Sequence, residues 1–188
     1  MKFLESSVCS AITATLLLVA LFSNSVFAEG ELLVVSYKQD LFATNPHGKN
    51  LPIVDEAALE AACVAMALAH NMQAAYKAGQ APHPVAVFPS LGGVKLANER
   101  LLIETGLDQE ECPIGKDMAD PDYPEVPLMY KALGELVRDF IGNDGQLVIC
   151  PLCWNNRGYD NDDMFDGAIL DQAAIGGLFF SPGKSIDF

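Results

Sequence analysis

Apolar and polar positions divide this chain into two kinds of segment that alternate along it. Short apolar runs without a polar alternation are typical of strands buried on both faces. They are residues 31–37, 85–88, 147–149, 168–170 and 184–188. Longer segments with helical patterning or start and stop signals are residues 55–78, 92–105, 128–141 and 171–180. This alternation predicts a single α/β domain in which a five-stranded, mostly parallel sheet is covered by helices on both faces.

The segment 55–78 is the clearest predicted helix. Asp55 favours its start, the segment is rich in alanine and leucine, and Gly79 follows it. At about 100° per residue its polar side chains form one band, which includes Cys63 and His70, and the rest is apolar. We therefore expect a solvated His70 and an apolar surface that lies against the sheet and against a second subunit.

The stretch 146–158, Q-L-V-I-C-P-L-C-W-N-N-R-G, joins a predicted strand to a short helix. Pro151 suits the first helical position, which places Cys150 at the N-cap and Cys153 one turn later. Unpaired backbone N–H groups and the helix dipole favour thiolate over thiol there, and Arg157 adds positive charge. In parallel sheets, ligands bind beyond the carboxyl ends of the strands, where Cys150 is predicted to lie. We predict Cys150, Cys153 and Arg157 as the site residues.

Two other interpretations of the C-x-x-C motif remain open. The pair can be a passive structural disulfide, or it can be half of a zinc site. Zinc is disfavoured because the chain has no second C-x-x-C and no H-x₃₋₅-H spacing. A calcium loop beginning at Asp160 is disfavoured because its sixth position is Phe165 and not glycine. We predict neither a metal nor another cofactor.

The first 28 residues carry the features of a secretory signal peptide. Lys2 gives a basic start, residues 11–22 form an apolar run too short to span a bilayer, and V-F-A at 26–28 suits signal cleavage. A retained anchor is the minor alternative. The expected mature chain starts near Glu29, occupies the periplasm or the medium, and has no membrane anchor after cleavage.

Net charge limits the classes of partner, and cysteine content indicates the compartment. The formal net charge is −14, and it remains −14 after loss of one basic and one acidic residue with residues 1–28. This charge disfavours nucleic acid and anionic membrane surfaces as partners. Loss of Cys9 leaves four of the five cysteines, an even number suited to an oxidising compartment.

An acidic, proline-rich insert at about 104–127 interrupts the strand and helix pattern. It contains Cys112, and a Cys63–Cys112 disulfide would tie it to the first long helix, although sequence alone does not fix the pairing. The glycines at 92–93 fit either an anion-binding turn or close packing.

The chain resembles the DsrE/DsrF-like family, to which the sulfur-relay subunit TusD belongs. The resemblance rests on the first strand with its alanine-rich helix, G-G-V-K-L-A, I-C-P-L-C-W-N-N-R-G, and the ending G-A-I-L…I-G-G-L-F-F-S-P-G-K-S-I-D-F. It implies a five-stranded sheet with Rossmann-like or flavodoxin-like layering and assembly into trimers or hexamers. In sulfur-relay members a cysteine after the strand that precedes an R-G pair carries persulfide sulfur. Cys150 matches that cysteine, and Arg157-Gly158 match the pair. This chain departs from the pattern in its predicted export and its acidic insert.

Three functions follow as hypotheses. The first is persulfide sulfur transfer on Cys150, with a donor or acceptor protein as partner. The second is thiol–disulfide exchange by Cys150 and Cys153. The third is a non-catalytic oligomeric binding protein with structural disulfides. Counting free thiols in the exported protein separates them, because four free thiols favour sulfur chemistry and none favours the structural role.

Overall fold

The computed structural model describes residues 32–43, 52–113, 131–180 and 184–188. The predicted signal peptide, the expected mature start at Glu29 and residues 114–127 of the insert lie outside these ranges. No helix in the described part of the chain is long and apolar enough to cross a membrane.

A four-stranded parallel sheet forms the centre of the domain. Its strands lie in the order β5-β4-β1-β6. They are β5 (Gln146–Leu147), β4 (Val85–Pro89), β1 (Leu33–Tyr37) and β6 (Ser185–Asp187). Val35 of β1 lies opposite Val87 of β4, and both side chains are fully buried. The predicted α/β class with a parallel sheet is confirmed.

The predicted fifth strand at 168–170 is reduced to one isolated bridge. Ile169 pairs in parallel with Val148. Its N–H group donates to the carbonyl oxygen of Leu147, and its own carbonyl accepts from the N–H of Ile149, each over 2.8 Å. Gly167, with φ of +84°, and the helix that follows leave too few residues for a longer ladder. The predicted count of five strands is therefore corrected to four.

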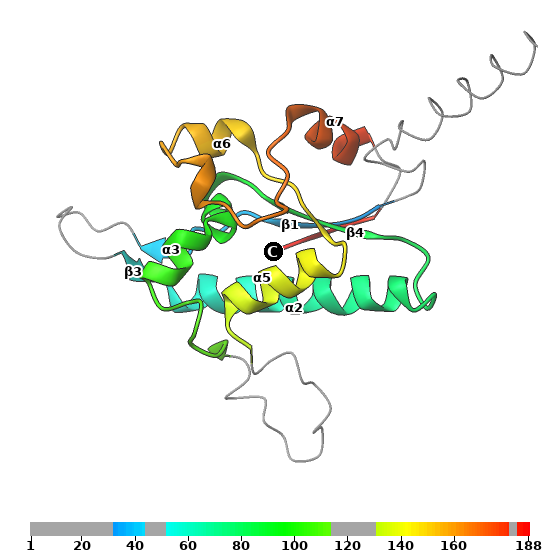
Figure 1. Ribbon diagram of the computed structural model, residues 1–188, viewed down its shortest axis with the longest axis horizontal. Helices are drawn as coiled ribbons and strands as arrows, with labels where there is room; N and C mark the ends of the chain where they lie inside the picture. The colour runs from blue at the N-terminus through cyan, green and yellow to red at the C-terminus, as the bar shows by residue number, and fades with distance from the viewer. Residues whose placement is uncertain (1–31, 44–51, 114–130, 181–183) are drawn as a thin grey trace, which may run out of the picture. The chain divides into compact units, whose positions relative to one another are not determined.

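Helices cover both faces of this sheet (Figure 1). One face carries α2 (Glu56–Lys77), which packs on β1 and β4 and against α5 (Leu133–Gly142). The opposite face carries α6 (Pro151–Asn155) and α7 (Gln172–Phe180). Asp55 caps α2, as expected, by accepting the N–H of Ala58 over 3.0 Å.

The polar band predicted on α2 is partly covered. Cys63 is only 1% exposed, and His70 is half-buried with a buried Nδ1 that has no hydrogen-bond partner among the described residues. The expectation of a solvated His70 is therefore wrong, because α5 packs against α2. A helical projection of α2 shows its own residues only, so it does not reveal the contact with α5. Part of the surface of α2 is thus covered by α5. The second subunit expected against the remaining surface of α2 stays a prediction.

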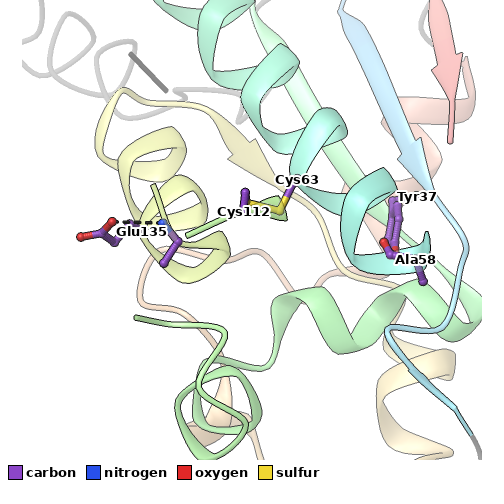
Figure 2. The surroundings of a disulfide bond; sticks show 6 residues. Tyr37, Ala58, Cys63, Cys112 and Glu135 are labelled. Carbon is purple, nitrogen blue, oxygen red and sulfur yellow. Dashed lines mark hydrogen bonds between the residues drawn. A yellow bond between two sulfur atoms is a disulfide. The ribbon is translucent and has the colours of Figure 1, made fainter. Parts of the chain in front are cut away.

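A disulfide joins Cys63 of α2 to Cys112, with their Cα atoms 6.0 Å apart (Figure 2). This is the pairing that would tie the start of the insert to the first long helix. Beside it, the N–H of Ala132 donates to the Glu135 carboxylate over 3.2 Å, where α5 begins. The disulfide is buried, since Cys112 is only 2% exposed.

The helix expected over 92–105 is broken into two parts. A 3₁₀ helix, η1 (Leu91–Ala97), precedes α3 (Glu99–Glu104), and the side chain of Asn98 caps α3 by accepting the N–H of Leu101 over 2.8 Å. A Cβ atom on Gly93 would overlap the carbonyl oxygen of Tyr37. Close packing therefore accounts for this glycine.

The segment 38–54, which follows β1, contains a small two-stranded sheet in its described part. β2 (Phe42–Ala43) pairs antiparallel with β3 (Ile53–Val54). The side chain of Lys95 forms a 2.6 Å ion pair with Asp40 and lies 5.5 Å from the ring centroid of Phe42. This segment therefore packs on η1 at the carboxyl end of β1.

Candidate functional site

Cys150 lies where the sequence places it, between the end of a strand and the start of a helix. The chain leaves β5 through the fully buried Ile149, and Cys150 is the N-cap residue of α6 with Pro151 at the first helical position. The Sγ atom of Cys150 accepts the backbone N–H of Cys153 over 3.2 Å. An N–H group that points at Sγ favours the charged thiolate when the thiol is free.

Cys150 and Cys153 form a disulfide, with their Cα atoms 5.2 Å apart. Both residues are partly exposed, in contrast to the buried Cys63 and Cys112. The domain thus holds one disulfide inside its core and a second one within reach of solvent. Only the second is accessible to an attacking thiolate.

Arg157 lies at the other end of α6. Its guanidinium group donates to the backbone carbonyl of Cys153 over 3.1 Å, and Gly158, with φ of +67°, follows. This contact places its charge at the carboxyl-terminal turn of the helix, where it complements the helix dipole. The structure therefore brings Cys150 and Cys153 together and leaves Arg157 outside the cleft that they line.

Trp154 follows Cys153 directly and anchors α6 in the core. The indole is fully buried and packs edge-to-face on Tyr159, with ring centroids 5.0 Å apart. Burial raises the pKa of the Tyr159 hydroxyl above its usual value. The Trp154–Tyr159 contact therefore joins α6 to the chain that follows it.

The cysteine pair lines a cleft of about 670 Å³ on the α6 and α7 face of the sheet. Apolar side chains of the sheet and of the two helices form much of its wall. They are Val34, Phe88, Leu152, Ile175 and Leu178. Ser36, Ser90, Ser185 and Gln172 supply polar groups. Leu152 and Leu91, which also line the cleft, are 67% and 62% exposed, and Leu91 has a φ of +50°.

Three charged side chains line the same cleft: Lys38, Lys184 and Asp187. The Lys38 ammonium lies 3.4 Å from a carboxylate oxygen of Asp187, and both side chains are more than half exposed. Neither Lys38 nor Lys184 was predicted from the sequence as a site residue. Lys38 follows β1 directly, so the rule that ligands bind at the carboxyl ends of strands was a usable signal. Lys184 precedes β6, and no pattern in the sequence marks it.

The aspartates around residue 160 serve as helix caps and ion-pair partners. Asp160 caps the 3₁₀ helix η3 (Asn161–Asp163) by accepting the N–H of Asp162 over 3.3 Å, and Asp163 lies 3.5 Å from Arg100. Within the described ranges, no three His, Cys, Asp or Glu side chains are grouped so that they could hold a metal ion. Capping is therefore the observed role of the aspartate-rich stretch.

Comparisons with known proteins found likenesses among solved structures. No protein-family model matches the chain, and none of the curated proteins matches it. Among solved structures, the chain is similar to the crystal structure of the ychN protein from E. coli, with 12% sequence identity and a TM-score of 0.42. The match covers 85% of this chain and 99% of the ychN chain.

Proposed function

We propose that this chain is an exported, DsrE-like protein that carries sulfane sulfur on Cys150. The observation that carries the proposal is the Cys150 Sγ atom at the N-cap of α6, 3.2 Å from the Cys153 nitrogen and on the wall of an open cleft. The resemblance in the I-C-P-L-C-W-N-N-R-G block supports it, because the persulfide cysteine of sulfur-relay members corresponds to Cys150.

The chemistry begins with the reduced pair. The Cys150 thiolate attacks the terminal sulfur of a sulfane donor, a sulfur–sulfur bond forms at Cys150, and the donor's remaining thiolate leaves with the electron pair of the broken bond. An acceptor thiolate can then remove the sulfur. If Cys153 attacks the inner sulfur instead, HS⁻ leaves and the Cys150–Cys153 disulfide returns. The two cysteines therefore set how long the persulfide lasts.

Thiol–disulfide exchange is the second candidate, and a specific observation favours it. Cys150 and Cys153 are bonded to each other and partly exposed, which is the oxidised state of a redox-active pair. The same N-cap N–H group would stabilise the Cys150 thiolate in the reduced state.

Mass spectrometry of the reduced protein tests the first proposal. After treatment with inorganic polysulfide, a mass increment of one sulfur atom is expected on the Cys150 peptide, and Cys153→Ser should retain it longer. Cys150→Ser should lose it. The buried Cys63 and Cys112 peptides serve as internal controls. A protein that cycles between dithiol and disulfide with dithiothreitol, but never gains sulfur, would instead support the redox candidate.

Export and assembly belong to the same proposal. The mature protein should begin near Glu29, which N-terminal sequencing of protein from the cell envelope would detect, whereas a start at Met1 would indicate a retained anchor. We also propose a homo-oligomer, a trimer or hexamer as the family resemblance implies. Light scattering that gives a monomer at micromolar concentration would contradict it.

A further inference from the structure

The cleft beside the cysteine pair has features that an inorganic sulfur donor does not require. We propose that it binds small organic thiols, and their persulfides, that carry a carboxylate group. This inference rests on the proposed function, since it names the substrate class of the same site.

The size and lining of the cleft favour an organic body. Its volume of about 670 Å³ lies within the roughly 300–1,000 Å³ usual for small-molecule sites. Val34, Phe88 and Leu178 present apolar surface to it. An inorganic polysulfide has no carbon skeleton with which to displace water from that surface, whereas an organic thiol has one.

The charges in the cleft favour an anionic group on that body. The whole chain has a formal net charge of −14, yet the charged residues that line the cleft are Lys38, Lys184 and Asp187, a local balance of 2 − 1 = +1. The Lys38–Asp187 pair is 3.4 Å long and exposed, so it is weak, and a ligand carboxylate can replace its anion. Lys184 has no ion-pair partner among the described residues.

The position of Lys38 indicates which of the two lysines would meet the carboxylate of the ligand. Lys38 follows the carboxyl end of β1, and Cys150 follows β5, so both lie at the same edge of the parallel sheet. Lys184 lies before β6, beyond the opposite strand ends. A short ligand whose sulfur meets Cys150 therefore places its carboxylate at Lys38, and Lys184 adds attraction at longer range.

Organic thiols and their persulfides supply every reactant that reduction and sulfur loading of the cysteine pair require. Two organic thiols reduce the observed Cys150–Cys153 disulfide: the first forms a mixed disulfide and frees one cysteine thiolate, and the second attacks that bond and leaves as the organic disulfide. The protein gains two electrons and two protons, and the two thiols lose them. The Cys150 thiolate then attacks the outer sulfur of an organic persulfide, which forms protein persulfide and releases the organic thiolate.

The reduction step provides the test, with 3-mercaptopropionate and the neutral 2-mercaptoethanol as probes of similar size. Trp154, the only tryptophan of the chain, follows Cys153 directly, so its fluorescence can report reduction of the pair. Rates are compared per concentration of thiolate in full-length mature protein. We expect the anionic thiol to react about two- to fivefold faster than the neutral one, and Lys38→Gln to remove that preference. Lys184→Gln should reduce it less.

Lys77→Gln is the matched control, because Lys77 is an exposed lysine on α2 that pairs with Asp144 outside the cleft. It should leave the ratio of the two rates unchanged. If 3-mercaptopropionate reacts more slowly than 2-mercaptoethanol in every variant, as the net charge of −14 alone would dictate, the proposal is overturned. A ratio that falls as protein concentration rises would also overturn it, because a second copy would then occupy the cleft. The rate ratio is measured without sulfur loading. Its outcome for the ligand proposal is therefore independent of whether Cys150 gains the mass of one sulfur atom.

Discussion

The hydroxyl group of Tyr37 donates a 2.8 Å hydrogen bond to the backbone carbonyl of Ala58, and thereby joins the end of β1 to the first turn of α2 (Figure 2). Tyr37 is fully buried, and burial raises the pKa of its hydroxyl well above the usual value, so the group stays a neutral donor. Tyr37→Phe should lower the free energy of unfolding by about 1 kcal/mol in urea. Tyr76→Phe, at a position 36% exposed, should have little effect and serves as the control.

The two disulfides should differ in their contribution to stability. Cys63 and Cys112 are 49 residues apart, and Cys150 and Cys153 are three apart. The chain-entropy model then gives about 4 kcal/mol for the long loop and about 2 kcal/mol for the short one. Urea unfolding under non-reducing conditions should therefore show a larger loss for Cys63→Ala with Cys112→Ala than for the matched double variant at 150 and 153. Equal losses would mean that the long loop is already restrained in the unfolded chain.

His70 should make the domain less stable in mild acid. Burial lowers the pKa of its imidazole from the usual value of about 6.5; the Asp139 carboxylate opposes this shift and the Lys131 ammonium adds to it. The unfolded chain therefore binds a proton more readily than the folded one, and stability is lost as the pH falls below about 6.5 toward the folded pKa. The measurement is urea unfolding at pH 7.5 and pH 5.5. His70→Gln should show a smaller drop between the two than the parent, and an equal drop in both proteins would contradict this.

The two cysteines of α6 should react at different rates once reduced. The Cys153 N–H points at Sγ of Cys150, while Cys153 lies one turn into the helix. In Cys153→Ser, Cys150 should be alkylated at pH 7 faster than the cysteine of an unstructured peptide. Cys150→Ser, which keeps only Cys153 of the pair, should react more slowly. If Cys150 reacts no faster than the peptide, the helix N-terminus does not activate it, and a structural role for the pair takes its place.

Local signals in the sequence predicted those parts of the fold that local chemistry decides. Asp55 caps α2, and Pro151 fixes Cys150 as the N-cap of α6, because each of these features depends on neighbours within one turn. Features that depend on distant neighbours were missed. Cys63 was assigned to a polar band because nothing in its own helix reveals that α5 packs against it.

The candidate site shows the same division. Cys150 and Cys153 are close in sequence, and the pair was predicted as a site. The cleft combines this pair with Lys38, more than one hundred residues before it, and with Lys184, about thirty residues after it. The strand expected at 168–170 failed for a related reason. Its apolar character was correct, but the positive φ of Gly167 and the start of α7 left room for only one bridge, at Ile169.

The chain leaves the core near Cys112 and returns to it at a neighbouring point. Glu111 forms a bridge with Ala132, and the N–H of Cys112 donates to the carbonyl oxygen of Lys131 over 3.1 Å. The two ends of the intervening segment are thus held together by hydrogen bonds that do not involve its own residues. Doubling the length of such a closed segment costs only about 0.6 kcal/mol of closure entropy. An affinity tag or a fluorescent reporter inserted between residues 114 and 130 should therefore cost the domain little stability, and neither Glu111 nor Ala132, which hold the ends of this segment, lines the cysteine cleft.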